Sequence, residues 1–276
     1  MNNFILEDGY NSDYIYSMIF AMFYKPSVGM NKIINSDTRH SDTYFIQEFI
    51  KTKFIYPIHR NLSIESSTVN KLRLYLYNCN WLKNSTILEH GNISDFYSFL
   101  VSTMMEYKLQ FIKIEPNNNI LTYPKYDLVH ITDEYINDNS PKIMSLSTLF
   151  SNWINSEIIQ NIYSFKFDIV PFILPIYLDI RDPNTKLNKK YIDIMECINL
   201  EENGDKIQRT LVWEIHSFVC QSHIDDHYYA VIIDKDDNFI IISDKMVPSC
   251  KKINKDDIKN IKLFMLEVRF VFYKAQ

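Results

Sequence analysis

The chain has 276 residues, of which 46% are hydrophobic and 14% aromatic, and its formal net charge is -5. This length can bury a sizeable core, and this composition excludes a chain that is disordered over most of its length. Because 29 Lys and Arg face 34 Asp and Glu, no excess of cations is available to neutralise phosphates. We therefore expect neither nucleic acid nor a membrane among the partners.

Targeting segments and metal sites are also not indicated. The apolar run at residues 15–24 is too short to span a bilayer, and the first residues lack the pattern of a signal peptide, which favours a cytoplasmic protein. The cysteines are far apart, without a CxxC pair or nearby histidines, so we expect reduced thiols, no metal and no cofactor. They are Cys79, Cys197, Cys220 and Cys250. The abundance of Asn, Ile, Lys and Tyr, with only 4 Gly, indicates an A+T-rich genome such as that of a large DNA virus or a protist.

Helical patterns occupy the first 110 residues. Ser12 or Asp13 can cap a helix that ends at Pro26, because proline cannot continue it. Further helices are predicted over residues 42–53, 67–77 and 92–107, from apolar residues three and four apart. Ser94 or Asp95 can begin the last of these, while the alternating leucines of the middle one are also typical of a strand.

The pattern changes after residue 110 to short runs rich in Ile, Val, Phe and Tyr, separated by Asn, Asp and Pro. Such runs predict strands of a mainly antiparallel sheet. The predicted strands are residues 111–115, 128–131, 169–180, 191–194, 210–219, 227–233, 239–243 and 261–273. Helices followed by strands indicate an α+β domain, with a helical half (1–110), a strand-rich half (111–276) and a cleft between them.

Two short segments carry the chemistry. Residues 11–17 read NSDYIYS, and residues 226–231 read DHYYAV. They resemble the N-terminal box (GNTCYMNS) and the late box (GHYYAY) of the ubiquitin-specific proteases, a family of papain-like cysteine proteases. The resemblance implies that Asp13 stands in place of the nucleophilic cysteine, that Asn11 lies near the former oxyanion region, and that His227 stands at the general base.

Two more departures concern the same predicted site. Residues 239–244, FIIISD, are similar to the family's WYxFDD strand. The similarity implies that Ser243 replaces the orienting Asp or Asn and that Asp244 falls at the second acid. Asp226 replaces the glycine that precedes the catalytic histidine, which adds bulk and a negative charge beside the cleft.

Weaker similarities follow in the order of the family. They are Asp95, Phe99 and Leu100 with the DxxEFL helix, Pro171, Leu174, Ile176 and Leu178 with the PxxLxIxLKRF strand, Lys186 with the next lysine, and residues 268–274 with the closing YxLFYxR strand. Together they cover nearly the whole chain and imply a thumb-like helical half and a palm-like sheet half. The missing CxxC pairs imply a reduced fingers region near residues 155–168, without zinc.

The resemblance therefore implies a pseudoenzyme, because a carboxylate is a weak nucleophile toward an amide. We expect an inactive protein that binds ubiquitin, a ubiquitin-like protein or other viral proteins, or that has a structural role. Its place would be the host cytoplasm or a virion. One alternative is an active cysteine protease that uses Cys220 with His227, and another is a scaffold that does not bind ubiquitin.

The simplest interpretation of the two key residues is structural. Asp13 can stabilise a helix N-terminus as a cap and through the helix dipole, and His227 can be a satisfied structural histidine. If the two side chains meet, each should favour the charged form of the other.

Overall fold

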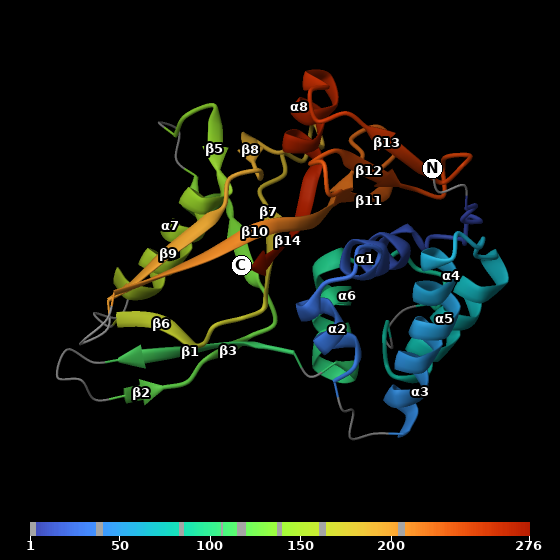
Figure 1. Ribbon diagram of the computed structural model, residues 1–276, viewed down its shortest axis with the longest axis horizontal. Coiled ribbons are helices and arrows are strands. Elements are labelled where there is room, and N and C mark those ends of the chain that lie inside the picture. Colours follow the sequence, from blue (N-terminus) through green and yellow to red (C-terminus); the bar gives the residue numbers. More distant parts are fainter. Residues whose placement is uncertain are drawn as a thin grey trace.

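Helices from the first part of the chain gather in one region of the molecule, and a large twisted sheet forms most of the rest (Figure 1). The computed structural model describes residues 4–36, 41–82, 86–105, 107–114, 120–136, 140–159, 164–203 and 208–276. The expected combination of helices and a mainly antiparallel sheet is confirmed.

The helices before residue 110 are α1 (Asp13–Phe23), α2 (Val28–Ile34), α3 (Ser41–Ile50), α4 (Tyr56–His59), α5 (Ser66–Asn78) and α6 (Ile93–Phe99), with π-helical turns η1 (Lys51–Ile55) and η2 (Leu100–Met104). The four predicted helices are present, whereas α2 and α4 were not predicted. The cap of α6 is Asn92, whose Oδ1 accepts hydrogen bonds from the N–H groups of Ser94 and Asp95 at 2.8 and 3.4 Å. The predicted start at residue 92 is thus confirmed to within one residue, but the cap lies two or three residues before Ser94 and Asp95.

The main sheet has eight strands, with the order β13-β12-β11-β10-β14-β7-β4 and β9 also paired with β10. Their bounds are β4 (Val129–Thr132), β7 (Ile173–Asp179), β9 (Ile198–Asn203), β10 (Gln208–Gln221), β11 (Tyr228–Ile233), β12 (Phe239–Ile242), β13 (Cys250–Ile253) and β14 (Val268–Ala275). All these pairs are antiparallel except β4 with β7.

A smaller sheet contains β1 (Leu109–Ile114), β2 (Ile120–Thr122), β3 (Lys125–Tyr126) and β6 (Ser164–Ile169), and a parallel pair contains β5 (Ile143–Ser145) and β8 (Tyr191–Asp193). A short 3-10 turn, η3, covers Asp133–Tyr135. The region expected to hold reduced fingers, residues 155–168, contains the end of α7 (Leu146–Ile159) and most of β6. Residues 160–163 of that region lie outside the described residues.

One predicted strand is wrong over half of its length. Residues 261–267 belong to α8 (Ile258–Glu267), and only the remainder forms β14. Asp257 caps this helix by accepting from the N–H of Asn260 at 3.2 Å, and Ile261 and Phe264 are three residues apart, as helical packing requires. In the sequence, the cap residue Asp257 was a better sign of this helix than the apolar composition of the segment.

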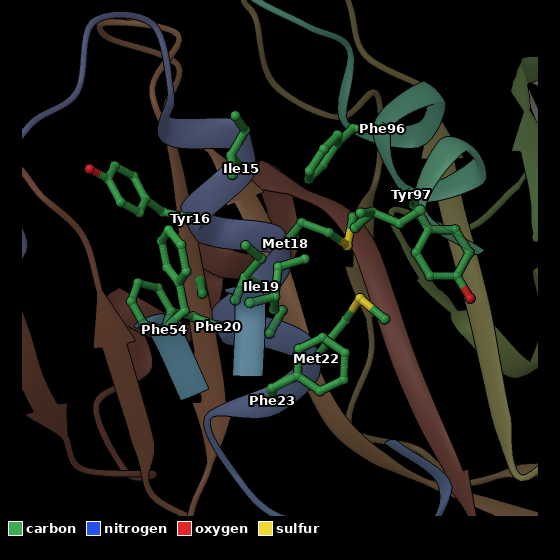
Figure 2. Packing of buried hydrophobic residues seen from close by; sticks show 14 of the residues in the cluster. Ile15, Tyr16, Met18, Ile19, Phe20, Met22, Phe23, Phe54, Phe96 and Tyr97 are labelled. Carbon is green, nitrogen blue, oxygen red and sulfur yellow. The ribbon is translucent and has the colours of Figure 1, made fainter. Parts of the chain in front are cut away.

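The core lies on both faces of the main sheet. All eleven residues of α1 are buried, and this helix packs against β10 and β11, with Phe96 and Tyr97 of α6 beside it (Figure 2). On the opposite face, a second cluster includes residues of α7 and α8. Each large apolar side chain that is fully buried contributes about 1.5 to 3 kcal/mol, so this packing fixes α1 firmly against the sheet.

Candidate functional site

The two segments that resemble protease boxes meet where α1 begins and β11 starts. Asp13 is the first residue of α1 and is only 6% exposed. Its Oδ2 accepts a hydrogen bond from the backbone N–H of Tyr228 at 2.7 Å, across 215 positions of sequence. The side chain of Ser12 bonds back to the carbonyl of Gly9 at 2.7 Å. The carboxylate of Asp13 thus points to the sheet, and the contacts that it makes there differ from those of the helix cap expected from the sequence.

Two histidines and two carboxylates form a continuous series of contacts at this point, which we call the carboxylate–imidazole row. His90 Nε2 lies 2.9 Å from Asp13 Oδ1. His227 Nδ1 lies 3.4 Å from Asp13 Oδ2, and His227 Nε2 lies 2.6 Å from Asp244 Oδ1. The structure therefore brings Asp13, His227 and Asp244 together, as the two boxes and the late strand suggested that it should.

The row favours a charged imidazole at His227. Burial alone would lower the pKa of His227, but the hydrogen bond and negative charge of Asp244 and the charge of Asp13 raise it overall. Burial would likewise raise the pKa of Asp13, but the hydrogen bonds from His90 and Tyr228 and the charges of both histidines lower it overall. Because a carboxylate only accepts hydrogen bonds, an imidazole between two of them is attracted to both only when both ring nitrogens carry protons.

Ser243 and Asp244 both lie at Nε2 of His227, and Asp244 makes the closer contact. The Oγ of Ser243 lies 3.4 Å from His227 Nε2, whereas the carboxylate of Asp244 lies at 2.6 Å and its side chain is 2% exposed. Ser243 thus stands beside the ring, and the following residue, Asp244, supplies a carboxylate at the same nitrogen.

A cavity of about 480 Å³ opens beside the row, between the helical and the strand-rich parts of the chain. Its lining is Asp8, Gly9, Tyr10, Asn11, Ser12, Asp13, His90, Arg181, Gln221, Asp225, Asp226, His227 and Lys245. The expected cleft is confirmed. Asn11 lies at its wall in a left-handed conformation (φ 49°), and its Nδ2 donates to the carbonyl of Leu88 at 3.1 Å.

Asp226 does not leave a bare negative charge in the cavity. Its Oδ1 accepts from Arg181 at 2.7 Å, and its Oδ2 is paired with Lys186. Burial would raise the pKa of Asp226, but these two cations lower it overall. The residue adopts a positive φ of 59°, a conformation that glycine adopts freely and that aspartate tolerates better than most residues. The predicted added charge is thus largely compensated.

Cys220 is far less accessible than a nucleophile requires. It is fully buried on β10, it is paired with Tyr229, and it belongs to the core cluster opposite the one that contains Tyr228. Burial raises the pKa of its thiol well above the usual range. All four cysteines are described, and the lining of the cavity beside Asp13 includes none of them.

Asp8 and His90 also belong to this site, and the sequence did not indicate either of them. His90 precedes α6 in a loop, and a lone histidine there has no spacing signal. Asp8 lies in the N-terminal segment and lines the cavity, and burial together with the charge of Asp244 raises its pKa. Within the described ranges, no group of three or more His, Cys, Asp or Glu side chains could hold a metal ion, and no helix is long and apolar enough to cross a membrane.

No family model matches the sequence, and no curated protein matches it. Solved structures match the fold. A crystal structure of an essential yeast splicing factor has a TM-score of 0.60 at 12% identity, covering 100% of this chain and 70% of that one. The SAGA Ubp8/Sgf11/Sus1/Sgf73 DUB module bound to ubiquitin aldehyde has a TM-score of 0.60 at 12% identity, covering 100% and 68%. The fold is thus similar to the ubiquitin-specific protease fold of Ubp8.

Proposed function

We propose that this protein is an inactive relative of the ubiquitin-specific proteases that binds other proteins at the cleft between a thumb-like helical half and a palm-like sheet half. The observation that carries the proposal is the position of Asp13. Its carboxylate lies 3.4 Å from His227, which in turn contacts Asp244 at 2.6 Å. A protease would need a thiolate at that point to attack a carbonyl carbon.

The contacts of Asp13 also oppose nucleophilic attack. Its oxygens accept hydrogen bonds from His90 and from the backbone of Tyr228, and its pKa is lowered overall. Both effects stabilise the carboxylate in place and reduce its tendency to form a new bond. The burial and raised pKa of Cys220 argue against the alternative in which that thiol acts with His227.

Ubiquitin or a ubiquitin-like protein is the first partner to test. The support is the likeness of fold to a DUB module that was solved with ubiquitin aldehyde and with monoubiquitin, together with the cavity beside Asp13. A structural role in the cytoplasm or in a virion is compatible with the same inert site, and it requires no bound ubiquitin.

Ubiquitin carrying a C-terminal electrophile tests the inactivity. We expect no covalent adduct with the wild-type protein and an adduct with Asp13→Cys, because the substitution places a thiol beside the existing His227 and Asp244. The double variant Asp13→Cys with His227→Ala is the matched control and should react much more slowly. An adduct on the wild type would overturn the proposal, and its loss in Cys220→Ala would identify the buried thiol as the nucleophile.

Binding is tested separately by titrating ¹⁵N-labelled ubiquitin with the wild-type protein. We expect shift changes confined to one surface of ubiquitin. Their absence at about millimolar concentration, which corresponds to a binding free energy weaker than about -4 kcal/mol, would favour the scaffold without ubiquitin binding.

A further inference from the structure

The segment of residues 86–92 contributes His90 to the lining of the cavity, and it contacts both the helical part and the sheet. Its backbone is anchored on the helical side: Arg73 Nη2 donates to the carbonyls of Ile87 and Glu89, the latter at 3.1 Å, and Asn11 donates to Leu88. His90 reaches the other side. Its ring stacks on Tyr228 of β11 with centroids 5.6 Å apart and planes at 11°, while its Nε2 contacts Asp13.

Asp13 is therefore shared by the two walls of the cavity. Oδ1 contacts His90, whereas Oδ2 contacts the backbone of Tyr228 and the ring of His227. Any group that enters the cavity toward Asp13 must compete with these donors. His90, with 38% of its side chain exposed, is the donor that can be displaced with the least disturbance of the core.

We propose that the carboxylate–imidazole row is a proton-controlled latch, in which the charged ring of His227 keeps Asp13 in place and Asp13 in turn holds His90 and residues 86–92 closed against β11. The latch would act in the same way whichever partner the cavity binds, and whether or not the protein is an enzyme.

The charges around His227 support the direction of the control. The groups that face its ring are the carboxylates of Asp8, Asp13, Asp225 and Asp244, the ammonium of Lys245 and the hydroxyl of Ser243. On the far side of Asp13 stands His90. Four carboxylates against one nearby ammonium favour the imidazolium, since opposite charges at these distances stabilise the charged form.

Loss of one proton changes the contact with Asp13 before the contact with Asp244. The remaining proton stays on Nε2, because the N···O distance to Asp244 is 2.6 Å and that to Asp13 is 3.4 Å. The lone pair of Nδ1 then faces a buried carboxylate, which is repulsive. Asp13 retains only His90 and the N–H of Tyr228, so the hold on residues 86–92 weakens.

The latch should loosen as the pH rises. The pKa of His227 is raised in the folded protein, so the latch is fully closed below the unfolded value near 6.5, and it loosens as the pH rises through the folded value. A histidine without the carboxylates would show no such window.

Two measurements on the wild-type protein test the latch together. The ring pKa of His227 is read from a histidine ¹H–¹⁵N titration, and the protection of amides 86–92 is read from hydrogen exchange corrected for intrinsic rates. We expect protection to fall through the same pH range in which the ring loses its proton, by about tenfold for each pH unit between the unfolded and folded values.

Two variants distinguish the latch from a general loss of stability of the protein. Asp13→Asn keeps an acceptor for Tyr228 but removes the charge, and it should make the protection of residues 86–92 independent of pH. Asp257→Asn, which changes the cap of α8, is the matched control and should leave the transition in place. Protection that does not follow the ring titration in the wild type, or a transition that persists in Asp13→Asn, would overturn the proposal.

Discussion

The two ends of α1 are each held by a histidine of the β10 and β11 region, but the two histidines are in opposite states. At the N-terminal end, His227 contacts two carboxylates and its pKa is raised. At the C-terminal end, His216 of β10 is fully buried, and its Nε2 donates to the carbonyl of Lys25 at 3.1 Å. Burial, together with the charges of Lys25 and Lys274, lowers the pKa of His216 to about 4.

The difference shows that the neighbours of a histidine decide its role, because both side chains meet the same helix. Neutral His216 contributes stability that is complete above the unfolded value of 6.5 and is lost as the pH falls toward about 4. Charged His227 contributes stability that is complete below 6.5 and is lost as the pH rises through its folded pKa. The anchoring of α1 should therefore be strongest slightly below neutral pH.

Removal of Asp13 should have the largest effect on this comparison, because it breaks a buried pair at one end only. We expect Asp13→Ala to lower the free energy of unfolding by about 3 to 5 kcal/mol near pH 6, as in other buried pairs that lose one partner. Urea denaturation measures the effect. Asp257→Ala, an aspartate at the start of α8 without a histidine partner, should cost only about 1 kcal/mol, and equal costs would contradict the role assigned to His227.

Acidification should affect the other end. The buried ring of His216 resists protonation, whereas the unfolded chain accepts the proton. Between pH 6.5 and pH 4 the free energy of unfolding of the wild type should therefore fall by on the order of 3 kcal/mol, since each unit of pKa difference corresponds to about 1.4 kcal/mol. His216→Gln keeps a donor for the carbonyl of Lys25 and cannot titrate. The loss of stability over this range should therefore be smaller in the variant, as measured by urea denaturation at several pH values.

The control for acidification is His130→Gln, because His130 lies half-exposed beside Asp179. It should keep the acid sensitivity of the wild type. If the wild type and His216→Gln lose stability in parallel, the buried ring takes no part in the acid response.

The sequence was sufficient for α1 and insufficient for what holds it. Ser12, Asp13 and Pro26 correctly marked the two ends of the helix, although neither Ser12 nor Asp13 caps it with its side chain. The meeting of Asp13 with His227 was expected only from the resemblance to a protease, since no local rule joins residues so far apart. His90 could not be foreseen, because a single histidine in a loop acquires its contacts only when the chain folds.

The same limit explains the errors in the strand-rich half. The apolar residues of α8 resemble a strand in composition, and the cap at Asp257 was the only local sign of a helix. The resemblance indicated Ser243 and Asp244 near His227, but it could not tell which of the two makes the closer contact. Similarly, nothing in the run around His216 distinguishes a buried neutral ring from an exposed one.

Substitution of the acid beyond His227 should have a smaller effect than removal of Asp13. Asp244→Asn keeps an acceptor for Nε2 but removes the charge, and hydrogen bonds to charged groups contribute about 1.5 to 3 kcal/mol. We expect a loss near the lower end of this range and a lower ring pKa of His227 by NMR. Ser243→Ala should change both quantities much less. If it changed them more than Asp244→Asn does, Ser243 and not Asp244 would be the residue that orients the ring.

The smallest effect is expected at Asp226, the immediate neighbour of His227 in sequence. Its charge is compensated by Arg181 and Lys186, and its side chain is 44% exposed, so these ion pairs contribute at most about 1 kcal/mol. Asp226→Gly loses them and relieves the positive φ of 59°, so the two effects oppose each other. We expect the stability to change by less than about 0.5 kcal/mol and the ring pKa of His227 to stay constant. A clear fall in that pKa would mean that Asp226, and not the carboxylate–imidazole row alone, keeps His227 charged.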